Sequence, residues 1–272
     1  MTTPTAGAAR LTHEKHFTSS ILLWVRTDQP RQTGMDYWKG PHSGIISATP
    51  GLLEYRQIHL AADNPGRWPD VPGVETAIPV DRRIDGVAEV TFRSAVSPLF
   101  GRTQNKLAFK DEVNVFRRTL LYAGPPRSSR WYDVGGTGGE AISTGARTML
   151  YLRRKGGVSG SRFRSVVKSD LVPALARSAE LTELRTQTFL PWVEKLWDTP
   201  DVAHDNPTDQ HLHASVSLGF ADAAARSAFF AGEGVSSLSA SLAEATAAVH
   251  AYDVEAALTF VKDGVVLPSY TE

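Results

Sequence analysis

The same order of strands and helices is predicted twice along this chain of 272 residues. Strands are indicated by apolar, β-branched or alternating segments, and helices by apolar residues spaced three and four apart. The first copy is predicted as strand 18–28, helix 34–50, strand 51–61, strand 85–94, helix 97–113 and strand 114–124. The second is predicted as strand 146–157, helix 159–178, strand 181–193, strand 210–222, helix 223–246 and strand 249–261.

The repeated βαββαβ order is that of the ferredoxin-like split βαβ unit. Aligning Leu22 with Leu150 gives an offset of 150 − 22 = 128, which indicates two copies of a domain rather than a solenoid. One sheet face of each unit is covered by its helices, and the other apolar face needs a partner. We therefore predict an α+β fold in which two ferredoxin-like repeats form an intramolecular α+β barrel.

The expected domain boundaries follow the repeat. A first ferredoxin-like domain spans 17–123, a linker spans 124–145, and a second, divergent domain spans 146–266. The linker is rich in glycine, proline and serine, so it is interpreted as a flexible connection. Within it, Trp131 and Tyr132 are expected to anchor the chain by packing.

Composition excludes several classes of protein. Lys plus Arg and Asp plus Glu both number 29, and the formal net charge of zero argues against a nucleic-acid or polybasic membrane binder. Cysteine is absent, which excludes disulfides, thiolate metal sites and a cysteine nucleophile. No signal peptide or membrane-length apolar run is seen, so a cytoplasmic protein is expected. The arginines at 153, 154, 162 and 164 are interpreted as a solvated edge in preference to an anion site.

The stretch DYWKGPHSGIISATPGLLEY, residues 36–55, is the most informative for function. Met35, Trp38 and His42 lie at helical spacing with Ile45 or Ile46, so they share one apolar, inward face. Gly40-Pro41 predicts a kink, or a helix that begins at the proline.

The first half resembles the EthD-like branch of the dimeric α+β barrel superfamily. The resemblance covers roughly residues 17–123, whereas the second half resembles only the topology. It is carried by these residues: Tyr37, Trp38, His42, Pro50, Gly51, Leu52, Tyr55, Asp85 and Gly86. The resemblance implies a small-molecule pocket between helix and sheet. It also implies a range of activities that includes polyketide cyclases, isomerases, decarboxylases, cofactor-free monooxygenases and haem enzymes.

His42, Tyr37 and Tyr55 are the candidate catalytic residues. A histidine can take or give a proton near neutral pH, and a tyrosine can donate a hydrogen bond to an oxyanion. Each residue has a packing alternative: a buried histidine bonded to a backbone group, and tyrosines that belong to the core or the rim. Trp38 is expected to form an aromatic wall for a flat substrate, or to pack.

His59, Glu89 and Arg26 are further candidate substrate-binding residues. His59 shares one side of its strand with Tyr55, and Glu89 is a possible partner for a histidine or an arginine. Edge or solvent positions are the alternative for Glu89 and Arg26. No metal site is expected: His211 and His213 point to one side of a strand, but no third ligand is visible, and solvent exposure is favoured.

The sequence therefore favours a cofactor-independent enzyme that applies acid–base chemistry to a hydrophobic aromatic or polyketide-like carbonyl compound. Cyclase, dehydratase, isomerase and decarboxylase chemistry all fit, and cofactor-free monooxygenation fits less directly. The alternatives are a non-catalytic carrier or sensor of a lipophilic metabolite, and a haem protein with a histidine ligand. The expected partner is the small-molecule substrate, with no nucleic acid or membrane, and the chain is expected to be a monomer (a pseudo-dimer) or a homodimer.

Overall fold

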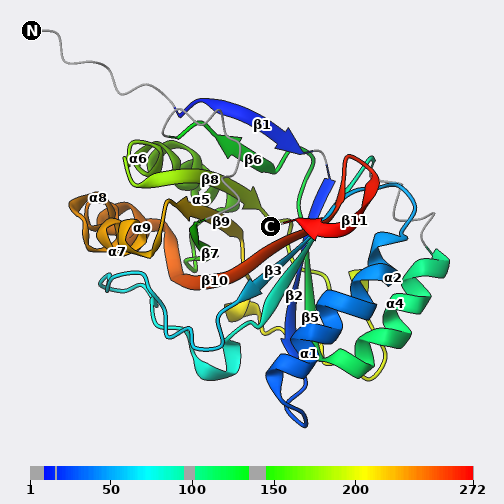
Figure 1. Ribbon diagram of the computed structural model, residues 1–272. Coiled ribbons are helices and arrows are strands. Elements are labelled where there is room, and N and C mark those ends of the chain that lie inside the picture. Colours follow the sequence, from blue (N-terminus) through cyan, green and yellow to red (C-terminus); the bar gives the residue numbers. More distant parts are fainter. Residues whose placement is uncertain (1–8, 16, 95–101, 135–144, 272) are drawn as a thin grey trace, which may run out of the picture.

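The computed structural model describes residues 9–15, 17–94, 102–134 and 145–271 (Figure 1). The first half contains β2 (Phe17–Val25), α1 (Arg31–Tyr37), the π-helical turn η1 (Trp38–His42), α2 (Ser43–Ser47), β3 (Leu52–Leu60), η2 (Val80–Arg82), β4 (Gly86–Phe92), α4 (Arg102–Val115) and β5 (Phe116–Ala123). The first residues of the helix predicted over 97–113 lie outside the described part of the chain.

The second half repeats this order. It contains β7 (Ala146–Arg154), α5 (Gly160–Val166), the π-helical turn η3 (Val167–Leu171), α6 (Val172–Ala176), β8 (Leu181–Thr188), η4 (Glu194–Leu196), η5 (Thr208–Gln210), β9 (Ala214–Phe220), α7 (Ala223–Ala231), α8 (Glu233–Ser236), α9 (Ser239–Ala245) and β10 (Thr246–Lys262). Outside the repeat lie β1 (Leu11–Lys15), β6 (Ser129–Tyr132) and β11 (Val265–Thr271).

The strands of each half have the ferredoxin-like order. They run β5-β2-β4-β3 in the first half and β10-β7-β9-β8 in the second, with all of these neighbours antiparallel. The halves join where β3 pairs with β10. The α+β fold class and the doubled βαββαβ order are confirmed. The two sheets are continuous through this one junction.

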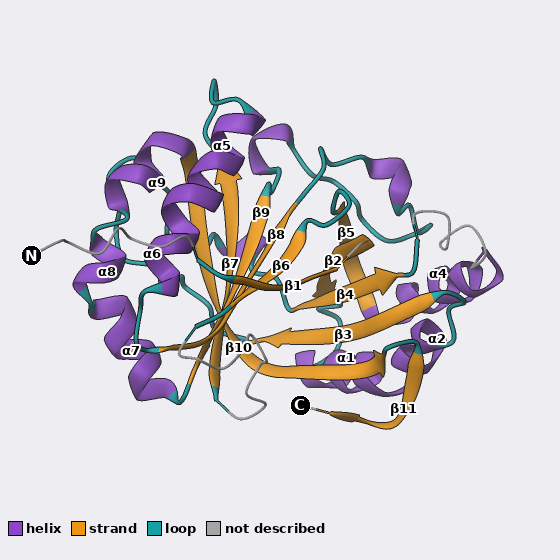
Figure 2. Cartoon of the chain, turned by 90° about the horizontal axis from the view of Figure 1, so that it is seen from above, coloured by secondary structure: helices purple, strands orange, loops and turns teal. Residues whose placement is uncertain are grey.

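Helices cover opposite outer sides of the curled sheet. Figure 2 shows α1, α2 and α4 on one side and α5 to α9 on the other, with the strands between them. Each helical layer has its own apolar cluster, centred on Trp38 and Phe116 in the first half and on Phe163 and Phe220 in the second. A third cluster, which includes Trp24 and Tyr151, contains strand residues from both halves. It forms the barrel interior.

The helical repeat is shifted by one residue from the predicted alignment. The π-turns begin at Trp38 and Val167, which gives an offset of 167 − 38 = 129 in place of 128. The same offset relates α1 to α5 and β3 to β8. The predicted kink at Gly40-Pro41 is the π-turn itself, which accommodates a residue without an N–H inside a helix.

A pair of short strands was missed by the sequence analysis. β6 lies in the segment interpreted as a flexible linker, and it pairs with β8 on one side and β1 on the other. Trp131 and Tyr132 are each 7% exposed, so they do anchor this segment by packing. Residues 135–144 of the same segment lie outside the described part.

Each half lends a long loop to the other. Residues 61–85 run along β10, where the Glu75 N–H donates to the Ala247 carbonyl. Residues 189–213 run along β5, where Ala203 exchanges hydrogen bonds with Arg117 and Thr119. These loops cover the same end of the barrel and bind the two halves together. No helix in the described part of the chain has the length and apolar character needed to cross a membrane.

Candidate functional site

His42 is held by a carboxylate on the neighbouring helix. Its Nδ1 lies 2.8 Å from Asp111 Oδ2, and the Tyr37 hydroxyl donates to Asp111 Oδ1 at 2.7 Å. His42 is 3% exposed, and Phe116 packs edge-on against its ring at 5.6 Å. The hydrogen bond from His42 holds the pKa of the Asp111 carboxyl below its usual range. The same carboxylate raises the pKa of Tyr37.

This arrangement leaves one ring nitrogen available. An ionised Asp111 accepts a hydrogen bond from Nδ1–H, so the lone pair of the neutral ring lies on Nε2. Nε2 makes no hydrogen bond within the described part of the chain. A histidine held in this way can act as a base toward a molecule that reaches Nε2.

Trp38 and the polar residues of β3 form a second, connected group. The Trp38 indole stacks on His59 at 4.6 Å, and its carbonyl accepts from Gln57 Nε2. Gln57 also donates to the Tyr55 hydroxyl at 2.7 Å, and its Oε1 lies 3.0 Å from His59 Nε2. The predicted stripe of Tyr55, Gln57 and His59 therefore faces the helices. Burial lowers the pKa of His59 to about 4, so its ring is neutral at pH 7.

Tyr37 and Tyr55 differ in burial and therefore in the roles that they can take. Tyr55 is fully buried, and this burial raises the pKa of its hydroxyl. Tyr37 is partly exposed, but its hydroxyl proton is directed at Asp111. Within the described contacts, Tyr37 positions Asp111 and Tyr55 extends the buried hydrogen-bond chain.

Glu112 is a buried carboxyl next to this group. It is 2% exposed and accepts from Trp197 Nε1 at 3.0 Å and from the Thr199 hydroxyl. Burial raises the pKa of Glu112 to about 7. The loop 189–213 of the second half is therefore tied to α4 by a carboxyl that changes charge near neutral pH.

The second half offers an internal comparison. With the offset of 129, Trp38, His42 and Tyr55 correspond to Val167, Leu171 and Leu184, all of them buried. Apolar side chains at these positions are therefore sufficient for this fold. The polar side chains of the first half therefore have a role that the fold alone does not require.

The other predicted site residues lie elsewhere. Glu89 is 2% exposed and faces the barrel interior, where its Oε2 accepts from Arg185 Nη1 at 2.5 Å. An arginine was one of the two partners that the sequence analysis considered for Glu89. The pair lies on the opposite face of the sheet from His59. Arg26 lies at the surface beyond β2, paired with Asp28 and donating to the Val113 carbonyl.

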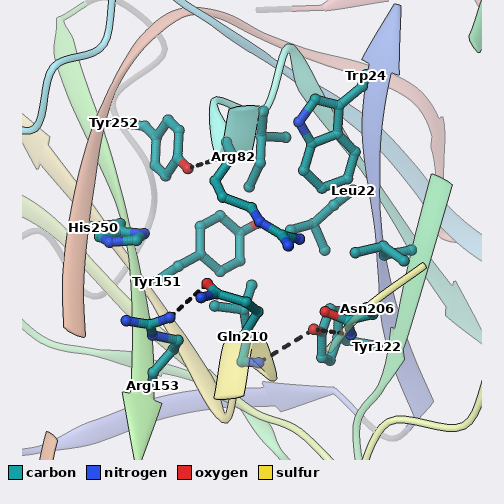
Figure 3. Close-up of a pocket in the computed structure, with 13 residues that line it drawn as sticks. Leu22, Trp24, Arg82, Tyr122, Tyr151, Arg153, Asn206, Gln210, His250 and Tyr252 are labelled. Atoms are coloured by element: carbon teal, nitrogen blue, oxygen red, sulfur yellow. Dashed lines mark hydrogen bonds between the residues drawn. The ribbon is translucent and has the colours of Figure 1, made fainter. Parts of the chain in front are cut away.

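A cavity lies inside the barrel, on the other sheet face from His42 (Figure 3). It holds about 390 Å³ of space that no atom fills, part of it open to solvent. Strands of both halves line it, and the two long loops cover it. Trp24, Tyr151 and Arg153 are among its residues. The sequence analysis expected a cavity between helix and sheet. The cavity found among the described residues lies inside the barrel instead.

Two predictions of solvent exposure were wrong. Arg153 is 6% exposed and donates to Gln210 Oε1, because β7 directs it into the barrel. His213 precedes β9 and is partly buried, with its Nδ1 accepting from the Arg154 N–H. Burial lowers the pKa of His213 to about 4.

Asp111 and Glu112 were missed for a simple reason. They lie in KLAFKDEV, a polar helical segment in which a single sequence does not distinguish a carboxylate facing His42 from one facing solvent. Their partners are Tyr37, His42, Trp197 and Thr199, up to 87 residues away. Only the tertiary fold brings them together.

The fold and its strand order are those of the dimeric α+β barrel proteins, here with both halves on one chain. Similar solved structures include an anthrone oxidase-like protein (TM-score 0.57, 10% identity, covering 92% of this chain and 95% of that one). A second is a protein from Fusobacterium nucleatum described as a monooxygenase (TM-score 0.53, 6% identity, covering 94% of this chain and 98% of that one). Another is from Lactobacillus acidophilus (TM-score 0.50, 10% identity, 94% and 100%). No family model and no curated protein sequence matches the chain.

The cavity in Figure 3 does not reach His42, so it offers no place for a haem bound by this residue. The described neighbours of its ring are Asp111 and Phe116, which contact it on the Nδ1 side and at the ring edge. The cavity lies on the opposite sheet face, where His250 is bonded to Glu75 instead.

Proposed function

We propose that this protein is a small-molecule enzyme in which His42 transfers a proton to or from a hydrophobic aromatic carbonyl substrate. The observation that carries the proposal is the 2.8 Å pair between His42 Nδ1 and Asp111, which leaves Nε2 as the free base. The internal comparison supports it, because Leu171 satisfies the fold at the equivalent position. We include in this proposal that the first half is an EthD-like domain, as its sequence resemblance implies.

The roles of the neighbouring residues follow from their contacts. Asp111 orients the imidazole and stabilises the imidazolium that forms when Nε2 takes a proton. Tyr37 holds the second oxygen of Asp111 and is therefore a positioning residue. Trp38 stacks on His59 and, like His42, packs edge-on against Phe116. Cyclisation, dehydration, isomerisation and decarboxylation all use such a proton transfer.

Anthrone is a suitable first probe, because its carbonyl acidifies a ring methylene. We expect the protein to accelerate deuterium incorporation at this methylene in anaerobic D₂O, followed by NMR. His42→Leu, which copies Leu171, should reduce the rate by about 10²–10⁴-fold while the protein stays folded. Equal exchange by the variant would contradict the proposal.

A second candidate is cofactor-free oxidation of the same kind of substrate, because the similar structures are described as an anthrone oxidase-like protein and as monooxygenases. It begins with the same proton abstraction, since the resulting anion is the species that reacts with O₂. Oxygen uptake with anthrone in air, abolished by His42→Leu, would support it. Exchange without oxygen uptake would favour the lyase or isomerase class.

A carrier or sensor remains the alternative of a different class. It predicts stoichiometric binding of a lipophilic molecule and no exchange above the rate in buffer. A cytoplasmic location, a small-molecule partner and a monomeric pseudo-dimer complete the proposal. Size-exclusion chromatography with light scattering tests the last of these.

A further inference from the structure

The barrel cavity is built from equivalent positions of the two halves. Leu22 and Trp24 of β2 correspond to Tyr151 and Arg153 of β7 at the offset of 129. Leu120 and Tyr122 of β5 correspond to His250 and Tyr252 of β10 at an offset of 130, set by the first residues of the strands. The cavity therefore lies where the two halves face each other.

The two walls of this cavity differ in chemistry. The first half contributes leucine, tryptophan, leucine and tyrosine at these positions, and the second contributes tyrosine, arginine, histidine and tyrosine. Arg82, from the loop 61–85, adds a second guanidinium. No aspartate or glutamate is among the described lining residues. One wall is apolar and aromatic, and the other is rich in hydrogen-bond donors and positive charge.

Three donors in the cavity lack a partner. The Tyr151 hydroxyl and the Trp24 indole N–H belong to side chains that are 1% and 2% exposed, and neither makes a hydrogen bond in the described part of the chain. The same holds for Arg153 Nε. In Figure 3 the Tyr151 ring projects into the middle of the ring of residues, and the Trp24 nitrogen faces inward. A buried donor without a partner is unfavourable, so an acceptor is expected here.

The carboxylates that balance the positive charge of the cavity lie outside its lining. Glu75, outside the lining, accepts from Arg153 Nη2 at 3.1 Å and from His250 Nε2 at 2.8 Å. Arg82 has a 3.5 Å contact with Asp81, a largely exposed carboxylate. Two guanidinium groups thus face the cavity, while the carboxylates that contact them, Glu75 and Asp81, lie outside its lining, which favours an anion inside it.

We propose that the barrel interior is a binding site for a small aromatic acid. Its ring would lie against Trp24, Leu22 and Leu120, and its carboxylate would accept from the Tyr151 hydroxyl and the arginines. This site is independent of the proposed chemistry at His42, because it lies on the other face of the sheet.

Isothermal titration calorimetry with benzoate and benzyl alcohol tests the proposal on the full-length protein. The two probes share the ring and differ in charge. We expect benzoate to bind one to one with a Kd below about 1 mM, and benzyl alcohol to bind at least about tenfold more weakly. Equal affinity for the two probes, or no benzoate binding at about 10 mM, would overturn the proposal.

Tyr151→Phe locates the site without disturbing the fold. The hydroxyl has no hydrogen-bond partner among the described residues, so its removal should leave Tm unchanged or raise it, yet weaken benzoate binding about tenfold. Tyr132→Phe, a buried tyrosine outside the cavity, is the matched control and should bind benzoate normally. His42→Leu should also bind normally, which separates this test from that of the proposed function. Unchanged benzoate affinity in Tyr151→Phe would show that the anion binds elsewhere.

Discussion

Asp111 is the residue on which the geometry at His42 depends. One oxygen of Asp111 accepts from His42 and orients the imidazole. The other oxygen accepts from the Tyr37 hydroxyl, which holds the carboxylate in place. A carboxylate used in this way acts through the histidine and not on the substrate. Its contribution should therefore disappear when the histidine is absent.

This dependence predicts a non-additive double substitution. Asp111→Asn should lower the rate of anthrone exchange roughly 10- to 100-fold, less than the loss of the base itself. In a His42→Leu background the same substitution should have almost no further effect, because the two residues act as a unit. Additive losses would instead indicate that Asp111 supports only the helix packing.

At the scale of elements, β4 and the π-turn fit together through a glycine. A Cβ on Gly86 would lie 2.3 Å from the Trp38 ring, so only glycine lets the indole reach the sheet. Gly86→Ala should destabilise the protein by about 1–3 kcal/mol, measured by urea unfolding. Gly44→Ala in α2 is the control: a Cβ there meets nothing within 4 Å, and stability should be unchanged or slightly higher.

The contact between α4 and the loop 189–213 predicts a pH dependence. The pKa of Glu112 is raised to about 7 in the folded protein, above its ordinary value of 4.5. The folded state therefore binds the proton more tightly, and this carboxyl reduces the free energy of unfolding as pH rises from about 4.5 to 7. The full effect is about 3 kcal/mol.

Glu112→Gln isolates this effect. The neutral amide keeps one acceptor oxygen for Trp197, and its NH2 can donate to the Thr199 hydroxyl, so the variant should gain stability relative to the native protein between pH 5 and 8. The difference between the two proteins is the informative quantity, because His59 and His213 act in the opposite sense. Their lowered pKa values cost stability as pH falls from about 6.5 to 4. A constant difference across this range would contradict the assignment.

At the scale of the whole molecule, each half completes the other. β3 pairs with β10, and each long loop covers an edge strand of the opposite half. Residues 1–135 expressed alone should therefore aggregate or dimerise, and coexpression with residues 136–272 should restore a soluble complex. A soluble, folded, monomeric first half would contradict this interdependence.

The strands of both repeats could be predicted because their apolar alternation is local. Strands β1 and β6 have five and four residues, too few for such a pattern; β6 depends on pairing with β8, and β1 on pairing with β6. The helix carrying Trp38 and His42 was predicted from its spacing, including the break at Pro41. The partners of that helix were not, since Asp111 meets His42 only after α4 has packed.

The most direct test of the account is the tautomer of His42, read from ¹⁵N NMR of the imidazole at pH 8. The contact with Asp111 predicts a proton on Nδ1 and an unprotonated Nε2, and Asp111→Asn should weaken this preference. His42 is assigned by comparison with His42→Leu. A proton on Nε2 in the native protein, with Nδ1 unprotonated, would mean that His42 is not poised as a base and would contradict the proposed function.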